Sequence, residues 1–399
     1  MIKHLKFTWK NIFIVLLFLN SVLTAQITNG AIIKGKVVDA KTRLPIENAN
    51  VFLLKSIKGS STNSSGKYEI KNVSNGSFSI MAAYVGYTYD KKTVRIENDK
   101  VLEVNFTLKP TVYNLPEVTV ASEEDDEWQD NFKLFRKYLI GTSSFAEETK
   151  ILNPYSINFS NDADGWLIAK INKPLIIENE ALGYQLTYFL KLFKTDGITI
   201  QYAGDPSFKE LKPKNDKEMQ KWNTNRLHAY CGSLRHFLYT ISKQYMIVKN
   251  IKSSSKTVDG NSFVEKMGFK VLLSNSLPNR SKYPPILQPV NIVRLLSKGF
   301  FVNELRLSFN NYLRITYTKK LEDEKIVDSW YGFSRDVSFP LSWISLRAPA
   351  AAIDKEGRYS TPFVIHNYGY WSFHGLADNL PYEYSVPDSV LEDIDFVSN

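Results

Sequence analysis

Between residues 32 and 108, apolar residues alternate with polar ones, and Asn, Ser and Gly interrupt the alternation. A period of two places one face of a strand in a core and the other face in water. Short strands with turn residues about every 8 to 12 positions are typical of a small sandwich or barrel. The pattern predicts strands at Ile32–Val38, Ala49–Leu54, Lys67–Ile70, Phe78–Tyr84, Lys92–Ile96 and Val101–Leu108.

Several motifs in this stretch resemble the carboxypeptidase-regulatory-like domain, a prealbumin-like (transthyretin-like) seven-strand β-sandwich common in exported Bacteroidota proteins. The matching residues are Gly35, Val37, Asp39, Pro45, Ala49, Val51, Gly66, Tyr68 and Gly86-Tyr87. The resemblance implies a structural or interaction module over residues 31–109, without an active site. Arg43 and Asn48 stand where the family usually has glycine. Because arginine adopts left-handed backbone less readily than asparagine, we expect the first loop to differ in shape.

Residues 1–25 have the features of an export signal. Lysines precede an unbroken apolar run, Ile12–Leu19, and small residues ending at Ala25 offer a cleavage site. The run is too short to span a bilayer as a mature helix, and an uncleaved N-terminal anchor is the alternative. The sequence therefore predicts export to the periplasm or to the outer membrane or cell surface, with a mature chain that is at most peripheral to the membrane.

The charge and the cysteine content exclude some classes of protein. The formal net charge is +9, and without the three lysines of the predicted signal it is +6 (9 − 3). These charges are dispersed, and no zinc finger, RNA-binding signature or basic helix occurs, so we expect no nucleic-acid partner. Cys231 is the single cysteine, which rules out an internal disulfide framework. At roughly 150 residues per domain, the length predicts two or three domains stabilised by burial.

A linker is predicted over residues 110–141. It combines a short alternating strand, Leu115–Val120, with an amphipathic helix at about Glu123–Ile140. The helix is indicated by apolar residues at helical spacing: Trp128, Phe132, Phe135 and Leu139. Acidic residues at its start suit the positive end of a helix dipole, and a calcium or partner site is the alternative.

The sequence pattern over residues 142–399 predicts a larger α+β domain, mostly β, to which we assign no function. One helix is predicted over Met219–Tyr245, with Gly232 marking a kink or close packing. Motifs such as Ile353–Gly357 resemble the C-terminal region of short exported Bacteroidota proteins, which has no assigned chemistry. Strands are predicted at Gly165–Ile171, Leu175–Ile177, Gly183–Phe193, Ile198–Ala203, Phe263–Leu273, Phe300–Phe309, Tyr312–Thr318, Lys325–Ser329 and Ser342–Leu346.

The histidines do not form a zinc-peptidase pattern. After the predicted signal there are four, and none is followed three residues later by Glu. His228 and His236 are eight residues apart on the predicted helix, roughly 12 Å along its axis, and both are expected to be exposed or at the rim. His366 and His374 lie around glycines, where a loop could bring them together at a weakly indicated metal site. Without a nucleophile elbow, P-loop or dinucleotide fingerprint, we expect no catalytic residue, metal or cofactor.

Aromatic residues, 13% of the chain, are the remaining functional feature. The densest cluster contains Tyr368, Tyr370 and Trp371, with His366 and His374 among them. Exposed aromatic rings stack on sugars or contact partners, so these five residues are the candidate binding surface. Burial in a β core is the favoured interpretation, because Tyr368/Tyr370 and Tyr382/Tyr384 also fit strand alternation.

These features together predict a non-catalytic cell-envelope protein that binds or scaffolds at the outer membrane or cell surface, with an envelope protein or a glycan as partner. Two alternatives stay open. One is a hydrolase or glycan-processing enzyme that uses the C-terminal region. The other is a truncated relative of TonB-dependent receptors, since Leu115–Val120 resembles the segment before their plug; the remaining length cannot hold both a plug and a large barrel. The sequence does not indicate an oligomeric state.

Overall fold

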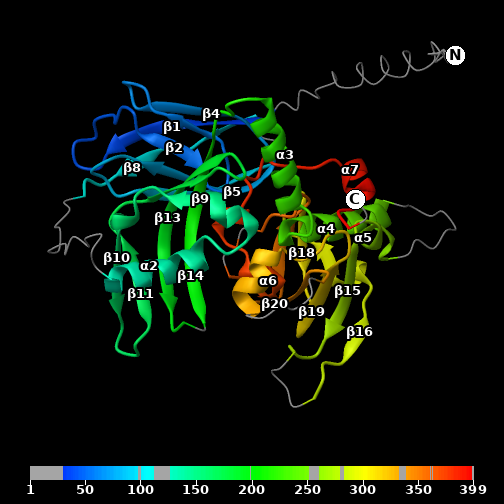
Figure 1. Ribbon diagram of the computed structural model, residues 1–399. Coiled ribbons are helices and arrows are strands. Elements are labelled where there is room, and N and C mark those ends of the chain that lie inside the picture. Colours follow the sequence, from blue (N-terminus) through cyan, green and yellow to red (C-terminus); the bar gives the residue numbers. More distant parts are fainter. Residues whose placement is uncertain are drawn as a thin grey trace, which may run out of the picture.

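The computed structural model describes residues 30–97, 100–111, 126–197, 199–250, 260–278, 283–331, 338–359, 361 and 363–397. The predicted export signal and the strand predicted at Leu115–Val120 lie outside these residues. The described part of the chain contains one large hydrophobic core in the N-terminal sandwich and two in the region after residue 126. We call that later region the body. Figure 1 shows the sandwich in blue, lying against the green strands of the body.

The sandwich consists of two sheets, in the strand orders β4-β1-β7, with β8 also on β1, and β3-β2-β5-β6. Strands β7 and β8 run parallel to β1 in one register, with Val101 opposite Ile32 and Phe106 opposite Val37. Together they occupy the place of one strand, which confirms the predicted seven-strand sandwich. The bounds are β1 Ala31–Asp39, β2 Asn50–Leu53, β3 Gly59–Ser61, β4 Lys67–Val73, β5 Gly76–Ala83, β6 Asp90–Ile96, β7 Val101–Glu103 and β8 Phe106–Leu108.

Two of the sequence motifs have direct structural reasons. A Cβ on Gly35 would lie 1.8 Å from the carbonyl oxygen of Val104, so only glycine fits where β1 passes the break between β7 and β8. The Tyr68 hydroxyl donates to the same oxygen at 2.6 Å. Asp39 accepts from the N–H groups of Lys41 and Thr42, both at 2.7 Å, and from the Tyr87 hydroxyl at 2.7 Å. The motif therefore joins the first loop to the β5–β6 loop.

The first loop departs from the prediction. Arg43 and Asn48 both adopt left-handed backbone, with φ of 61° and 58°, the conformation that glycine adopts without strain. Arg43 is held there because its N–H donates to Asp39 O at 3.0 Å, while the N–H of Asp39 donates to Leu44 O at 2.9 Å. The loop thus closes on itself without glycine.

The first half of the body is a sheet covered by one helix. Helix α2 (Asp126–Leu139) confirms the predicted amphipathic helix within the described residues. Its buried residues, among them Phe135 and Leu139, pack into one core with Leu175 and Phe193 of the sheet. The strand order is β10-β11-β13-β12-β9, and β14 pairs with β13. The strand bounds are β9 Thr149–Ile151, β10 Ile157–Asn161, β11 Leu167–Ile171, β12 Leu175–Asn179, β13 Tyr184–Thr195 and β14 Ile200–Glu210.

The second half of the body packs helix α4 against two sheets, in the orders β16-β15-β19-β20-β22 and β17-β18-β21. Short 3-10 turns, Ser144–Glu148, Pro154–Ser156, Ile292–Leu295, Tyr370–Phe373 and Leu376–Asp378, connect the elements of the body. The remaining bounds are α3 Asp216–Tyr230, α4 Leu234–Asn250, α5 Ser262–Lys266, β15 Phe269–Ser274, β16 Leu287–Pro289, β17 Leu296–Lys298, β18 Glu304–Leu307, β19 Tyr312–Tyr317, α6 Glu324–Tyr331, β20 Leu341–Leu346, β21 Ala351–Asp354, β22 Ile365–Gly369 and α7 Asp388–Asp393.

Three predictions in this half were wrong in detail. The long helix over Met219–Tyr245 is two helices, because Gly232 has a φ of 77° and the Tyr317 ring occupies the space beside it. The strand predicted at Lys325–Ser329 is helix α6, and the strand predicted from Phe263 begins with helix α5. No helix in the described part of the chain is long and apolar enough to cross a membrane.

Candidate functional site at the seam between sandwich and body

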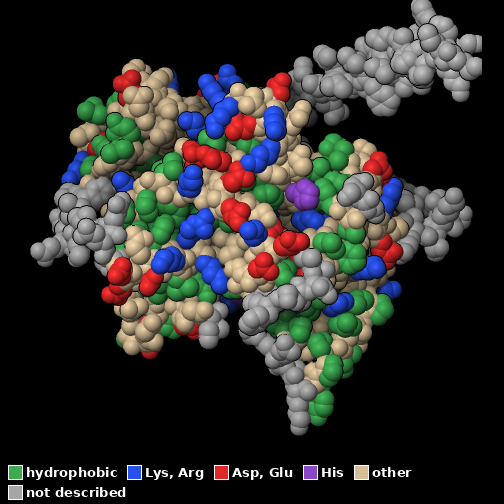
Figure 2. Space-filling view, viewed as in Figure 1, with side chains coloured by type: hydrophobic (Ala, Val, Ile, Leu, Met, Phe, Trp, Pro, Cys, Tyr) green, Lys and Arg blue, Asp and Glu red, His purple; other side chains and the backbone are tan. Residues whose placement is uncertain are grey.

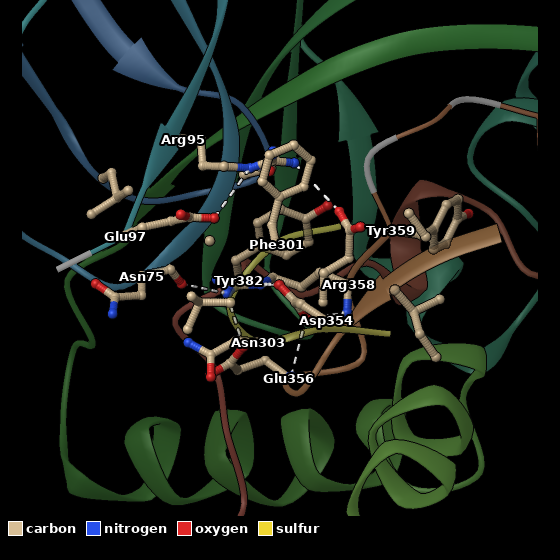
Figure 3. Close-up of a pocket in the computed structure, with 17 residues that line it drawn as sticks. Asn75, Arg95, Glu97, Phe301, Asn303, Asp354, Glu356, Arg358, Tyr359 and Tyr382 are labelled. Atoms are coloured by element: carbon tan, nitrogen blue, oxygen red, sulfur yellow. Dashed lines mark hydrogen bonds and ion pairs between the residues drawn. The ribbon is translucent and has the colours of Figure 1, made fainter. Parts of the chain in front are cut away.

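The sandwich meets the body along a polar interface that we call the seam. A cavity of about 40 Å³ lies within it, lined by the β4–β5 turn and β6 from the sandwich, and by the β17–β18 loop and the β21 turn from the body. Figure 3 shows Arg95 from one side, and Phe301, Asp354 and Arg358 from the other, gathered around the cavity, with Asn75 at its edge.

Arg358 lies at the centre of the seam, and its side chain is only 5% exposed. Its Nε donates to Asp354 Oδ2 at 2.6 Å, and one Nη donates to Glu356 Oε2 at 3.0 Å and to the Asn75 carbonyl at 3.1 Å. The guanidinium also lies over the ring of Phe78, 5.0 Å from its centroid. One side chain of the body therefore contacts both the turn and the core of the sandwich.

The local sequence explains how Arg358 reaches that position. Asp354 Oδ1 accepts from the backbone N–H groups of Glu356 and Arg358, which closes a tight turn after β21. Gly357 takes the left-handed φ of 75° that this turn needs, and a Cβ there would lie 2.3 Å from the carbonyl oxygen of Arg235. On the other side, a Cβ on Gly76 would lie 2.7 Å from the Arg358 guanidinium. Glycine on both sides thus leaves room for the arginine.

The β2–β3 turn forms a second contact across the seam. The Lys55 N–H donates to Pro206 O at 2.6 Å, and the Tyr382 N–H donates to Lys55 O at 2.8 Å. The Lys55 ammonium lies over the Tyr359 and Tyr382 rings, and the pKa of Lys55 is raised, mainly by its interaction with Tyr382. Glu383 accepts from the Ser56 hydroxyl at 2.6 Å and from the Ile57 N–H at 3.0 Å.

A third contact is the carboxylate of Asp205 on β14, which pairs with Lys91 of the sandwich at 3.1 Å and with Lys191 of the body. Burial raises the pKa of Asp205, but the hydrogen bonds and charges of the two lysines outweigh burial, so the pKa is lowered overall. Apolar contact accompanies these charges, since the Phe52 and Phe189 rings stack with centroids 5.6 Å apart.

The seam is consequently filled by the protein's own paired groups. Ligand pockets usually occupy roughly 300–1,000 Å³, whereas a cavity of about 40 Å³ has room for only a few water molecules. Glu356 has a raised pKa because it is buried, but its carboxylate is already paired with Arg358. The geometry is that of a structural joint.

The five residues of the predicted binding surface lie in different environments. Tyr370 and Trp371 are buried, 3% and 7% exposed, so they belong to the core that the sequence favoured. His366 and Tyr368 lie half-buried on β22, where His366 Nδ1 accepts from Arg347 at 3.3 Å. His374 instead pairs with Asp378 at 3.0 Å. The alternation that suggested strands is also incomplete, since Tyr370 is in a 3-10 turn and residues 381–384 form a turn.

Both helix histidines were expected to be exposed or at the rim, and for His236 this was wrong. His236 is fully buried among the rings of Tyr230, Phe269 and Tyr317, and its Nδ1 accepts from the Gly232 N–H at 3.1 Å. Burial lowers its pKa to about 3. His228 is half-buried against Phe396. Within the described ranges no group of three His, Cys, Asp or Glu residues could hold a metal ion.

Sequence reasoning did not identify Arg358 as an interdomain residue. The sequence contains part of the information needed to find it, because Arg358 directly follows the motif Ile353–Gly357. A turn with Asp at its start and Gly near its end is recognisable from sequence, but the partner of the next side chain is not. Asn75 lies 283 positions earlier and Phe78 lies 280 positions earlier (358 − 78).

Comparison with known proteins agrees with the fold of the N-terminal part. The CarboxypepD_reg-like domain family matches residues 33–120. No curated protein matches the chain.

Solved structures are similar only at low identity. They include the major pilin subunit BcpA of Bacillus cereus (15% identity, 20% of this chain and 30% of that chain, TM-score 0.18). A Bacteroides uniformis protein proposed to bind carbohydrate has 10% identity over 46% of this chain and 74% of its own, with a TM-score of 0.18. A Bacteroides fragilis protein of unknown function, proposed to be membrane-associated, has 16% identity over 46% and 83%, with a TM-score of 0.17.

The motif residues, the seven-strand topology and the family match agree. The N-terminal sandwich of this chain is a carboxypeptidase-regulatory-like domain.

Proposed function

We propose that the protein is a non-catalytic component of the cell envelope that binds or scaffolds at the outer membrane or cell surface. The observation that supports this most is the seam. An interdomain enzyme site needs an open cleft with reactive groups free to contact substrate, whereas here Arg358, Asp354 and Glu356 are engaged with one another. The sandwich is held as a fixed part of a larger body.

The surface of the body fits the same role. Figure 2 shows lysine and arginine side chains interspersed with aspartate and glutamate on the viewed face. A mixed surface of this kind does not produce the single-sign field that steers a polyanion such as nucleic acid to a protein. Binding to a partner would then depend on local sites rather than on the overall charge. We expect the partner to be an envelope protein or a glycan. The features of residues 1–25 would direct export.

The experiment is an activity screen of the purified protein with peptidase, esterase and glycosidase substrates, run beside the variant His366→Ala. The expected result is no turnover above the buffer control for either protein. Turnover by the wild-type protein that His366→Ala abolishes would contradict the proposal and favour an enzyme built on the C-terminal region. Metal analysis of the same sample supplies a second measurement, and the proposal expects no stoichiometric metal.

A further inference from the structure

A second, larger hollow lies on the sandwich and contains none of the residues that line the seam cavity. It is an open groove of about 790 Å³ over the β4-β1-β7/β8 sheet. Its lining includes Lys34 and Lys36 from β1, Lys67 from β4, and the amide residues Asn63 and Asn105. The volume is within the range of roughly 300–1,000 Å³ that is typical of ligand sites.

The cross-strand pairs in this groove are unusual. Lys36 on β1 is directly opposite Lys67 on β4, and both side chains are exposed. Like charges directly opposite on one face of a sheet destabilise it. In the neighbouring row Lys34 has Glu69 on one side and Glu103 on the other, so that row carries two acids for one lysine. The row of Lys36 and Lys67 therefore has two ammonium groups facing each other, with no acid directly opposite either of them.

The two acids of the neighbouring row also have other partners. Glu69 is engaged with Lys71 at 3.0 Å, and Glu103 accepts from the Asn105 amide at 2.9 Å. A further ammonium group, that of Lys92, donates to the Asn105 carbonyl at 2.5 Å and adds to the positive charge at that end. Within the described part of the chain, neither Lys36 nor Lys67 forms an ion pair.

The amides hold this arrangement in place. Asn105 Oδ1 accepts from the Lys36 N–H at 2.8 Å, and Asn63 Oδ1 accepts from the Lys67 N–H at 2.9 Å. A neighbouring amide side chain thus fixes the backbone position of each lysine. The groove offers several donors to an anionic group with hydroxyls or ring oxygens around it.

We propose that this groove binds an acidic polysaccharide, with the carboxylate of a sugar unit between Lys36 and Lys67. The inference rests on the proposed binding function and specifies its ligand class. A glycan is favoured over an acidic peptide because amides and hydroxyls line the groove, as with Ser60 and Ser61, and match sugar hydroxyls. Its rings, Tyr68 and Phe106, are buried at 4% and 1% exposure, so the groove offers no apolar pocket for peptide side chains.

Neutral sugars would bind poorly for a related reason. Sugar recognition without charge commonly relies on exposed rings that stack on the sugar face, and the two rings of this groove are covered. Affinity must therefore come from the ammonium groups, and it should decrease as salt screens them.

The test measures binding of the purified protein to polygalacturonate, dextran and polyglutamate by calorimetry at low and physiological salt. We expect binding to polygalacturonate alone, weakened at the higher salt. The double variant Lys36→Gln/Lys67→Gln should lose affinity at least about tenfold, because it removes both ammonium groups that contact the carboxylate. Lys41→Gln, which removes an exposed lysine of the β1–β2 loop, is the matched control and should bind as the wild type does.

Each other outcome contradicts the inference. Binding to dextran would show that charge is not the determinant, and preferential binding to polyglutamate would assign the groove to a peptide. An equal loss of affinity in Lys41→Gln would show that overall charge, and not the groove, determines binding. No binding to any of the polymers would contradict an acidic polysaccharide as the ligand. Thermal denaturation checks folding, and the double variant should melt at or above the wild-type temperature because the repulsion is gone. New reducing ends in the polygalacturonate sample would instead contradict the non-catalytic function itself.

Discussion

In the sandwich, the carboxylate of Asp39 is ionised and surrounded by donors, whereas in the body the imidazole of His236 is neutral and surrounded by aromatic rings. Both groups have lowered pKa values. For Asp39 the cause is mainly the Thr42 N–H, followed by the Tyr87 hydroxyl, and the pKa is about 2. For His236 the cause is burial, and the pKa is about 3.

The same direction of shift has different consequences for the two regions. Asp39 stabilises the folded sandwich at pH values above its ordinary pKa of 3.8, and this stability is lost as the pH falls toward 2. His236 must stay neutral in the fold, so the body begins to lose stability as soon as the pH falls below the ordinary value of 6.5. The comparison teaches that the body is the more acid-sensitive region.

The largest effect is expected where the two regions are joined. Arg358→Ala should lower the free energy of unfolding by about 3 kcal/mol, because it removes a buried side chain and leaves the partly exposed carboxylates of Asp354 and Glu356 without their partner. Urea denaturation checks the value. Arg358→Lys retains the charge and should cost less. A change below about 1 kcal/mol for Arg358→Ala would show that the seam does not couple the regions.

Acid sensitivity is the next prediction. Between pH 6.5 and pH 5 the wild-type protein should lose about 2 kcal/mol of stability through His236, since each pH unit below 6.5 costs about 1.4 kcal/mol until the folded pKa is reached. His236→Asn keeps an acceptor near the Gly232 N–H but does not titrate, so its stability should depend less on pH over this range. Urea denaturation at several pH values measures both slopes.

His228→Asn is the control for that experiment, because His228 is only half-buried, and burial and the charge of Lys320 both lower its pKa. The stability of this variant should depend on pH almost as steeply as that of the wild-type protein. If His236→Asn and the wild-type protein lost stability in parallel, another group would be the acid-sensitive one.

A smaller effect is expected within the sandwich alone. Arg43→Gly should raise the free energy of unfolding by about 0.5 to 1 kcal/mol, because glycine adopts the left-handed backbone at φ 61° without strain and Arg43 is exposed. Thermal denaturation detects the gain. Asn48→Gly is the matched comparison and should gain less, since asparagine tolerates this conformation. A loss of stability in Arg43→Gly would mean that the side chain makes a contact that outweighs the strain.

The smallest effect concerns the more exposed pair of the seam. Arg95 and Glu304 lie 3.3 Å apart, with side chains 30% and 15% exposed. A double-mutant cycle with Arg95→Ala and Glu304→Ala should give a coupling energy of about 0.2 to 1 kcal/mol, well below the Arg358 effect. A coupling energy as large as the loss expected for Arg358→Ala would show that the contact between β6 and the β17–β18 loop contributes as much to the seam as Arg358 does.

The fold of the sandwich was largely predictable because its signals are local. Alternating apolar residues and turn residues determine which face is buried. The strand that was missed, β3, consists of Gly59, Ser60 and Ser61 and has no apolar alternation to detect. The break between β7 and β8 was also not predicted, since it depends on Gly35 and Tyr68 from other strands meeting Val104.

The body was less predictable because its local signals are ambiguous. Helix α6 contains the β-branched residues Ile326 and Val327, which suggested a strand, although Trp330 completes a helical spacing with Ile326. The helix break at Gly232 is decided by the Tyr317 ring, a residue 85 positions later by their numbers (317 − 232). Seam and groove likewise depend on which strands become neighbours, and the sequence pattern does not contain that information.

The central claim is that the sandwich is a fixed part of the molecule, joined to the body while its lysine-lined groove faces solvent. Hydrogen exchange at the amides of Lys55 and Tyr382 tests it most directly, because their N–H groups donate across the seam to Pro206 and Lys55. The account predicts that both amides exchange as slowly as core amides of α4 such as Ile241, and that Arg358→Ala accelerates both. Exchange at the rate of an open loop in the wild-type protein would contradict it.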